Sequence, residues 1–163
     1  MGRNRFKGAQ AKRERGGFVA LPFMVLRSQA FFMLSAHAVK LLFDLLAAYN
    51  GNNNGDLCGA WKLMKPRGWK SRDTLDKAKA ELEAKQFIER TRQGGRNIPT
   101  LYAVTFFAID ECGGKLDVKH AGTPSGAWHQ NGKMLPITPP LKIKTPNTPS
   151  VPTTDELTRG ACQ

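Results

Sequence analysis

The carboxylates after the apolar run that ends at Asp110 are the chain's best candidates for metal chemistry. Asp110 is followed by Asp117 and Lys119. Metal-dependent nucleases hold divalent cations with such carboxylates and use a nearby lysine. In this chain the spacing between Asp110, Asp117 and Lys119 is tight, and the proline that precedes the first aspartate in the nuclease pattern is absent. A metal-dependent nuclease is therefore kept as an alternative, and we expect a protein that is not an enzyme.

Three further ligand patterns are incomplete. The stretch from Asn50 resembles a calcium loop, but its last ligand position falls on Trp61, and an indole offers no oxygen to a hard cation. In "GAWHQNGKM", Met134 replaces the hydroxyl that binds magnesium in a phosphate loop. The cysteines and histidines lack the paired spacing of a zinc site. We expect no metal and no cofactor.

Charge gives information about partners. The chain carries 25 Lys and Arg against 13 Asp and Glu, a formal charge of +12. This excess favours a polyanionic partner, nucleic acid first and an anionic membrane second. Three widely spaced cysteines fit a reduced cytoplasm, which is the expected location. Pro22 breaks the apolar stretch "FVALPFMVL", and Arg27 follows it directly. We therefore expect neither a signal peptide nor a membrane span.

Both ends differ in composition from the centre. Residues 1–17 are rich in Lys and Arg and are interpreted as a basic flexible arm. Residues 121–163 contain a Pro- and Thr-rich run with few large apolar side chains, which predicts a disordered tail. Trp128 is expected to pack back on the domain. The predicted domain spans residues 18–120.

The segment "LSAHAVKLLFDLLAAYN" predicts a core helix. Its apolar residues recur at helical spacing, and Ser35 is placed as the N-cap. The Asn and Gly cluster after Tyr49 predicts a turn, because these residues tolerate positive φ. "GDLCG" then predicts a short extended segment.

The second half of the domain predicts two helices and a hairpin. "AWKLMKPRGWK" favours a short helix that stops near Pro66 and Gly68, and "SRDTLDKAKAELEAKQ" favours a second helix capped by Ser71. "FIERTRQ" and "TLYAVTFFAI" are rich in strand formers, with "GGRNIP" as the tip between them.

In this order of elements the sequence resembles winged helix-turn-helix DNA-binding proteins, and more narrowly the short ones of phages, plasmids and integrative elements. The resemblance covers about residues 18–111. It rests on "LSAHAVKLLFDLLAAYNGNNNGDL", "PRGWKSRDTLDKAKAELEAKQFIERTR" and "LYAVTFFAID". It implies an α+β fold, a three-helix core with a β-hairpin wing. Such families commonly place Gly where the recognition helix meets the wing, and this chain has Gln86 there.

A capped helix can enter the major groove of DNA while a basic hairpin lies along the backbone. Placing Leu75 inward points the residues around it outward. The helix's amino end, with its free amides, favours phosphate. The predicted DNA-binding residues are Lys70, Ser71, Arg72, Asp73, Asp76 and Lys77 on the helix, Arg90, Arg92 and Arg96 on the wing, and Lys62, Lys65 and Arg67 before the helix.

Each group has a simpler interpretation. Asp73 and Asp76 can only accept hydrogen bonds and would otherwise repel the backbone, so they can equally be solvated residues. The wing arginines can serve only to keep an exposed edge soluble. We expect a double-stranded DNA-binding protein of a mobile element, acting in transcription regulation or replication, and a homodimer is compatible with it. The alternatives are the nuclease and a winged-helix protein-interaction module.

Overall fold

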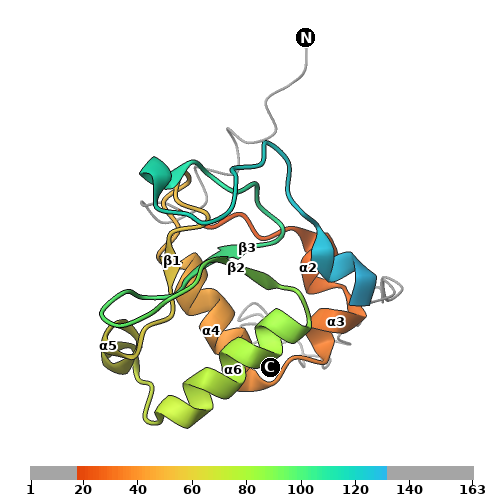
Figure 1. The fold of residues 1–163 in the computed structure, drawn as a ribbon. Helices are drawn as coiled ribbons and strands as arrows, with labels where there is room; N and C mark the ends of the chain where they lie inside the picture. Colours follow the sequence, from red (N-terminus) through yellow and green to blue (C-terminus); the bar gives the residue numbers. More distant parts are fainter. Residues whose placement is uncertain (1–17, 132–163) are drawn as a thin grey trace, which may run out of the picture.

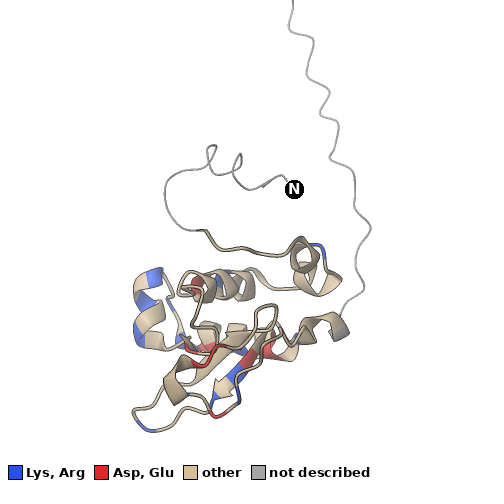
Figure 2. Cartoon of the chain, turned by 90° about the horizontal axis from the view of Figure 1, so that it is seen from above, with Lys and Arg blue, Asp and Glu red and all other residues tan. Residues whose placement is uncertain are grey.

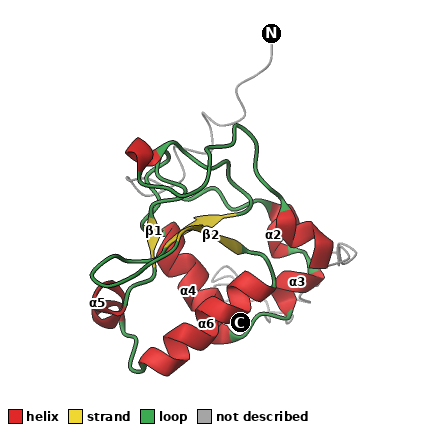
Figure 3. Cartoon of the chain, viewed as in Figure 1, coloured by secondary structure: helices red, strands yellow, loops and turns green. Residues whose placement is uncertain are grey.

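The computed structural model describes residues 18–131, so the predicted arm and most of the predicted tail lie outside the described residues. Within these bounds the chain has a mixed α+β fold, with five α-helices and one small three-stranded antiparallel sheet (Figure 1). Figure 3 shows long loops joining these short strands. The expected α+β class is confirmed.

The predicted core helix is α4, Ala36–Leu46. The Ser35 side chain accepts a hydrogen bond from the Ala38 N–H, which confirms the N-cap. One face of α4 is completely buried, as the helical spacing predicts. The buried residues are Ala38, Leu41, Leu42, Leu45 and Leu46.

The two predicted helices after the turn are also present. Helix α5, Trp61–Met64, continues into a 3-10 turn, η1, Lys65–Arg67, and ends at Gly68 with a φ of 88°. Helix α6, Arg72–Ala84, begins at its predicted cap, since Ser71 Oγ accepts from the Thr74 N–H. Its stripe of Leu75, Ala78 and Leu82 is buried against α4.

The sheet has the order β1-β3-β2. Strand β1 is Leu57–Cys58, β2 is Ile88–Arg92 and β3 is Leu101–Val104. A bulge between Arg90 and Arg92 interrupts the β2–β3 register. The predicted hairpin is confirmed, although β3 ends earlier than its run of strand formers.

A buried asparagine explains why β3 stops. Asn54 is 0% exposed, and its Nδ2 donates to the carbonyls of Val104, Phe107 and Ala108, while its Oδ1 accepts from the Val104 N–H. The chain after Val104 bends around this side chain instead of continuing along the sheet. The Asn and Gly cluster is therefore a turn, as predicted, and one of its asparagines also fixes the core.

Two short helices before α4 were not predicted. Helix α2 is Phe23–Leu26 and α3 is Gln29–Phe32, and between them Ser28 caps α3 by accepting from the Phe31 N–H. Four-residue helices carry too few turns for a hydrophobic period to stand out. Several large apolar side chains here stay exposed, among them Phe23 and Phe32.

Gln86 joins α6 to β2 in a left-handed conformation, with a φ of 58°. This is the position where the resemblance leads one to expect glycine. A residue with a Cβ costs about 1 kcal/mol in this region of backbone space. Gln86 thus occupies a position of positive φ without the conformational freedom of glycine.

The domain extends beyond the predicted boundary at residue 120. Ala121 forms a bridge with Ile109, and the Gly126 N–H donates to the Thr105 carbonyl. Trp128, in the 3-10 helix η3, Ala127–Asn131, is 3% exposed and stacks on Phe87. The predicted packing of Trp128 is confirmed. The boundary at 120 is too early, because a single tryptophan buries enough surface to hold a segment poor in other apolar residues.

Candidate nucleic-acid interface

Two carboxylates, Glu81 and Asp44, add polar contacts to the apolar packing of α6 on α4. Glu81 accepts from the N–H and the hydroxyl of Ser35, at 2.8 and 2.5 Å, so the carboxylate of α6 binds the first turn of α4. Burial acts to raise the pKa of Glu81, but these bonds and Lys85 bring it below its usual value. The two helices therefore have a fixed relative position.

Asp44 performs the same task at the other end of α4. Its carboxylate accepts from Trp69 Nε1 and from Lys40, both at 2.7 Å, and its backbone carbonyl accepts from Arg67 at 2.8 Å. Because Trp69 and Arg67 flank the turn before α6, Asp44 ties this turn to α4. The sequence analysis missed this role, although the Lys40–Asp44 spacing of four residues was a signal for an ion pair.

The amino end of α6 borders a small cavity of about 330 Å³. His37, Lys40 and Lys70 line it, together with the capping Ser71. The free amides of the first helical turn and these basic side chains favour an anionic ligand such as a phosphate. Next to it, Arg72 lies over the Trp61 ring, with the guanidinium carbon 5.7 Å from the ring centre.

The exposed face of α6 carries the residues that were predicted to contact bases. Arg72, Asp73, Asp76 and Lys77 are all exposed, as the placement of Leu75 requires. Two ion pairs cross this face: Lys77 with Asp73 at 2.8 Å, and Lys79 with Asp76 at 2.6 Å. The hydrogen bond to Asp73 raises the pKa of Lys77. The acidic and basic groups of this face largely neutralise each other.

The hairpin holds its arginines in different ways. Arg90 donates two hydrogen bonds to Glu83, at 3.1 and 2.9 Å, and one to Gln93. Arg92 donates to the Pro99 carbonyl at 3.2 Å. Arg96, at the tip, is exposed, and no ion pair joins it to another residue between 18 and 131. Only Arg96 of the three is therefore presented to solvent without an intramolecular partner in the described chain.

The tip of the hairpin has a defined shape. Gly95 and Ile98 form a bridge, and Asn97 takes a φ of 64°. A Cβ at Gly94 would lie 2.4 Å from Thr100 Oγ1, so this position requires glycine. The backbone of the tip therefore has a defined path, and Arg96 is exposed on it.

Basic residues gather where these elements meet. Figure 1 shows α5, the first turn of α6 and the hairpin tip on one side of the molecule, at the left of the view. The same side carries blue segments in Figure 2. Lys62, Lys65 and Arg67 come from α5 and η1, and all three are exposed. The structure thus places α5, the first turn of α6 and the hairpin tip on one side, whereas the predicted Arg90 and Arg92 lie in β2.

The carboxylates of the nuclease alternative belong to loop contacts. Asp110 accepts from the Asn54 N–H at 2.7 Å, and Asp117 accepts from the Gln93 N–H at 2.8 Å. Within residues 18–131 no group of three or more His, Cys, Asp or Glu side chains is placed to hold a metal ion. Lys119 is exposed.

Helices long and apolar enough to cross a membrane do not occur in the described part of the chain. Comparison of the chain with protein-family models, with curated proteins and with solved structures finds no match.

Proposed function

We propose that this chain binds double-stranded DNA as a winged helix-turn-helix protein. In this account α4, α5 and α6 form the helical core, α6 enters the major groove, and the β2–β3 hairpin is the wing. The observation that carries the proposal is the common side shared by α5, the first turn of α6 and the hairpin tip (Figure 1). Such a surface can span a groove and the backbone beside it.

Different residues of this surface contact the phosphates and the bases. Lys62 and Lys65 are exposed and free to meet phosphates, as is Arg96 on the wing. Arg72, supported by Trp61, has a planar donor group that matches a guanine edge. Arg90 is held by Glu83 and contributes to the shape of the wing, not to binding.

The resemblance in element order supports a role in transcription regulation or replication of a mobile genetic element, in the cytoplasm. A two-fold symmetric site would indicate a homodimer, because half-site symmetry mirrors protein symmetry.

The test is binding to random duplex DNA across a salt series, followed by selection from a random duplex pool. Phosphate contact gives a steep linear fall of log K with log salt, by about 0.9 per contact. The selected site should show a preferred base at the position of Arg72, and Arg72→Ala should remove that preference. A binding constant that does not change with salt would overturn the proposal.

One observation favours a second function, a protein-interaction module. The Asp73–Lys77 and Asp76–Lys79 pairs make the exposed face of α6 nearly neutral, and a neutral helix face suits a protein partner as well as a base edge. In that case duplex DNA would bind weakly and selection would return no common sequence.

A further inference from the structure

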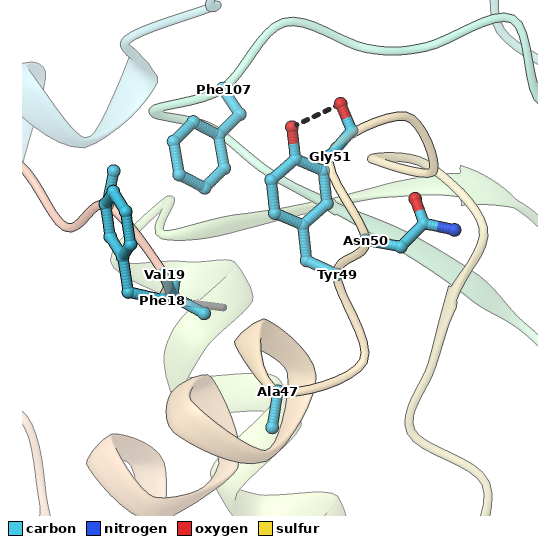
Figure 4. Close-up of a pocket in the computed structure, with 8 residues that line it drawn as sticks. Phe18, Val19, Ala47, Tyr49, Asn50, Gly51 and Phe107 are labelled. Atoms are coloured by element: carbon cyan, nitrogen blue, oxygen red, sulfur yellow. Dashed lines mark hydrogen bonds between the residues drawn. The ribbon is translucent and has the colours of Figure 1, made fainter. Parts of the chain in front are cut away.

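An apolar groove opens between the end of α4, the Asn- and Gly-rich turn and the chain after β3 (Figure 4). Its volume is about 640 Å³, and three aromatic rings line it, those of Phe18, Tyr49 and Phe107. Figure 4 shows Phe18 and Tyr49 on either side of Phe107, with Ala47 on the helix below them. The proposed DNA contacts use none of these residues.

The rings form a firm wall. Tyr49 and Phe107 stack with centroids 4.9 Å apart and an angle of 18° between planes. The Tyr49 hydroxyl donates to the Gly51 carbonyl at 3.0 Å, which fixes the ring. Burial, and after it the charge of Asp110, raises the pKa of Tyr49. The Asp110 carboxylate accepts a hydrogen bond from the Asn54 N–H, in the turn that borders the groove. The groove therefore offers ring surface with an acidic neighbour.

The chain itself contains a segment of matching chemistry. Pro146, Pro149 and Pro152 recur every three residues. A polyproline II strand has three residues per turn, so prolines at this spacing share one edge. Proline-rich strands dock on aromatic-lined grooves because their conformation is already restricted. Lys142 and Lys144 precede the prolines and complement Asp110 in charge.

The length of the chain permits the contact within one molecule. Fourteen residues lie between Asn131, where the described chain ends, and Pro146. Such a linker spans up to about 50 Å when extended and about 20 Å on average as a coil. A domain of this size has a radius of gyration of about 13 Å. The proline segment can therefore reach the groove, and the tether keeps its local concentration high.

We propose that the segment Pro146–Pro152 binds in the groove formed by Phe18, Tyr49 and Phe107 of the same chain. The contact is independent of the proposed DNA binding, because it uses a different surface. The groove would act as a receptor for a proline-rich strand, and any partner that presents such a strand would compete with the chain's own segment.

The experiment attaches a spin label to the full chain. Cys58, Cys112 and Cys162 are replaced by Ser, and Ser150→Cys supplies the single labelling site between two of the prolines. Paramagnetic broadening of amide NMR signals then reports which surface lies near residue 150. We expect the signals of Ala47 and Gly51 in the groove to lose most of their intensity in dilute protein, and those of α5 to keep theirs.

Two phenylalanines make a matched pair of variants. Phe18 and Phe32 are 66% and 63% exposed, so replacing either by Ser leaves the core intact. Phe18→Ser should abolish the selective broadening, whereas Phe32→Ser, outside the groove, should preserve it. Equal broadening on all surfaces, or an unchanged pattern in Phe18→Ser, would overturn the proposal. A mixture of spin-labelled chains with separate isotope-labelled chains tests for contact between molecules. Broadening found only in this mixture would also overturn the proposal, because the contact would then be intermolecular.

Discussion

On α6 the exposed charges pair with one another, whereas the lysines of α5 and η1 have no acidic partner among residues 18–131. Asp73 holds Lys77 and Asp76 holds Lys79, while Lys62 and Lys65 extend into solvent. A neutral helix face neither attracts nor repels a phosphate backbone, but it can still discriminate between base edges. Under the proposed function, affinity and selectivity are separated on this molecule, with α5 supplying the first and α6 the second.

The largest effect is expected from removing the two lysines of α5. Lys62→Ala combined with Lys65→Ala should lower the affinity for any duplex about 100-fold at 0.1 M salt and reduce the salt slope by about two, since each phosphate contact contributes on the order of ten-fold. Fluorescence anisotropy on random DNA measures both quantities. Lys119→Ala removes an exposed lysine from a loop and serves as the control. An unchanged salt slope in the double variant would remove α5 from the interface.

Replacing Arg72 tests whether α6 supplies the selectivity. Arg72→Ala should cost about 1 to 3 kcal/mol on the preferred site and less on random DNA. Trp61→Leu should reproduce part of this loss, because it takes away the ring beneath the guanidinium. Titrations on both kinds of DNA give the specificity ratio. If Arg72→Ala weakens both equally, Arg72 is a phosphate contact and the division between α5 and α6 fails.

Asp44 links the two regions, so its removal should affect both. Asp44→Ala leaves the Trp69 indole N–H, which is nearly buried, without its acceptor. We expect the free energy of unfolding to fall by about 1.5 kcal/mol, the range of a hydrogen bond to a charged group. Urea unfolding measures this. Asp56→Ala, which removes a pairing with Lys115 distant from α6, is the control and should cost less than half as much.

The smallest effect concerns the pairs on α6 themselves. Asp73→Asn should change stability by no more than about 0.5 kcal/mol, because the pair with Lys77 is exposed and four residues apart on a helix. It should nevertheless raise affinity for random DNA a few-fold, since it frees Lys77. Lys77→Gln should not raise that affinity. An increase in both variants would mean that the ion pair does not govern the charge of this face.

Most of the helical core could be predicted from the sequence. Ser35 and Ser71 predict the starts of α4 and α6 as N-cap residues. The spacing of the leucines within each helix identifies its buried face. These signals are local, so they need no knowledge of the remainder of the chain. The resemblance drew attention to Gln86 as a position where such families commonly have glycine, and its φ is positive.

What the sequence did not reveal depends on residues that meet only in the folded chain. Asn54 has the same residue type as its exposed neighbours, and nothing local marks it as the one that bends the chain after β3. The pairing of Arg90 with Glu83 likewise required the strand to lie beside the helix. At the candidate site, the exposed side chains of α6 were predicted, but the Asp73–Lys77 and Asp76–Lys79 pairs were missed, although their spacing of four and three residues is a local signal for ion pairs on a helix.

Asn54 also has a consequence for how the molecule folds. Its side chain bonds to residues about fifty positions away along the sequence. Closing a loop of that length costs about 3.5 kcal/mol of chain entropy before any of these bonds can form. The helices need only local contacts, so we expect this junction to form after them. Weakening it, as in Asn54→Ala, should therefore speed unfolding much more than it slows folding.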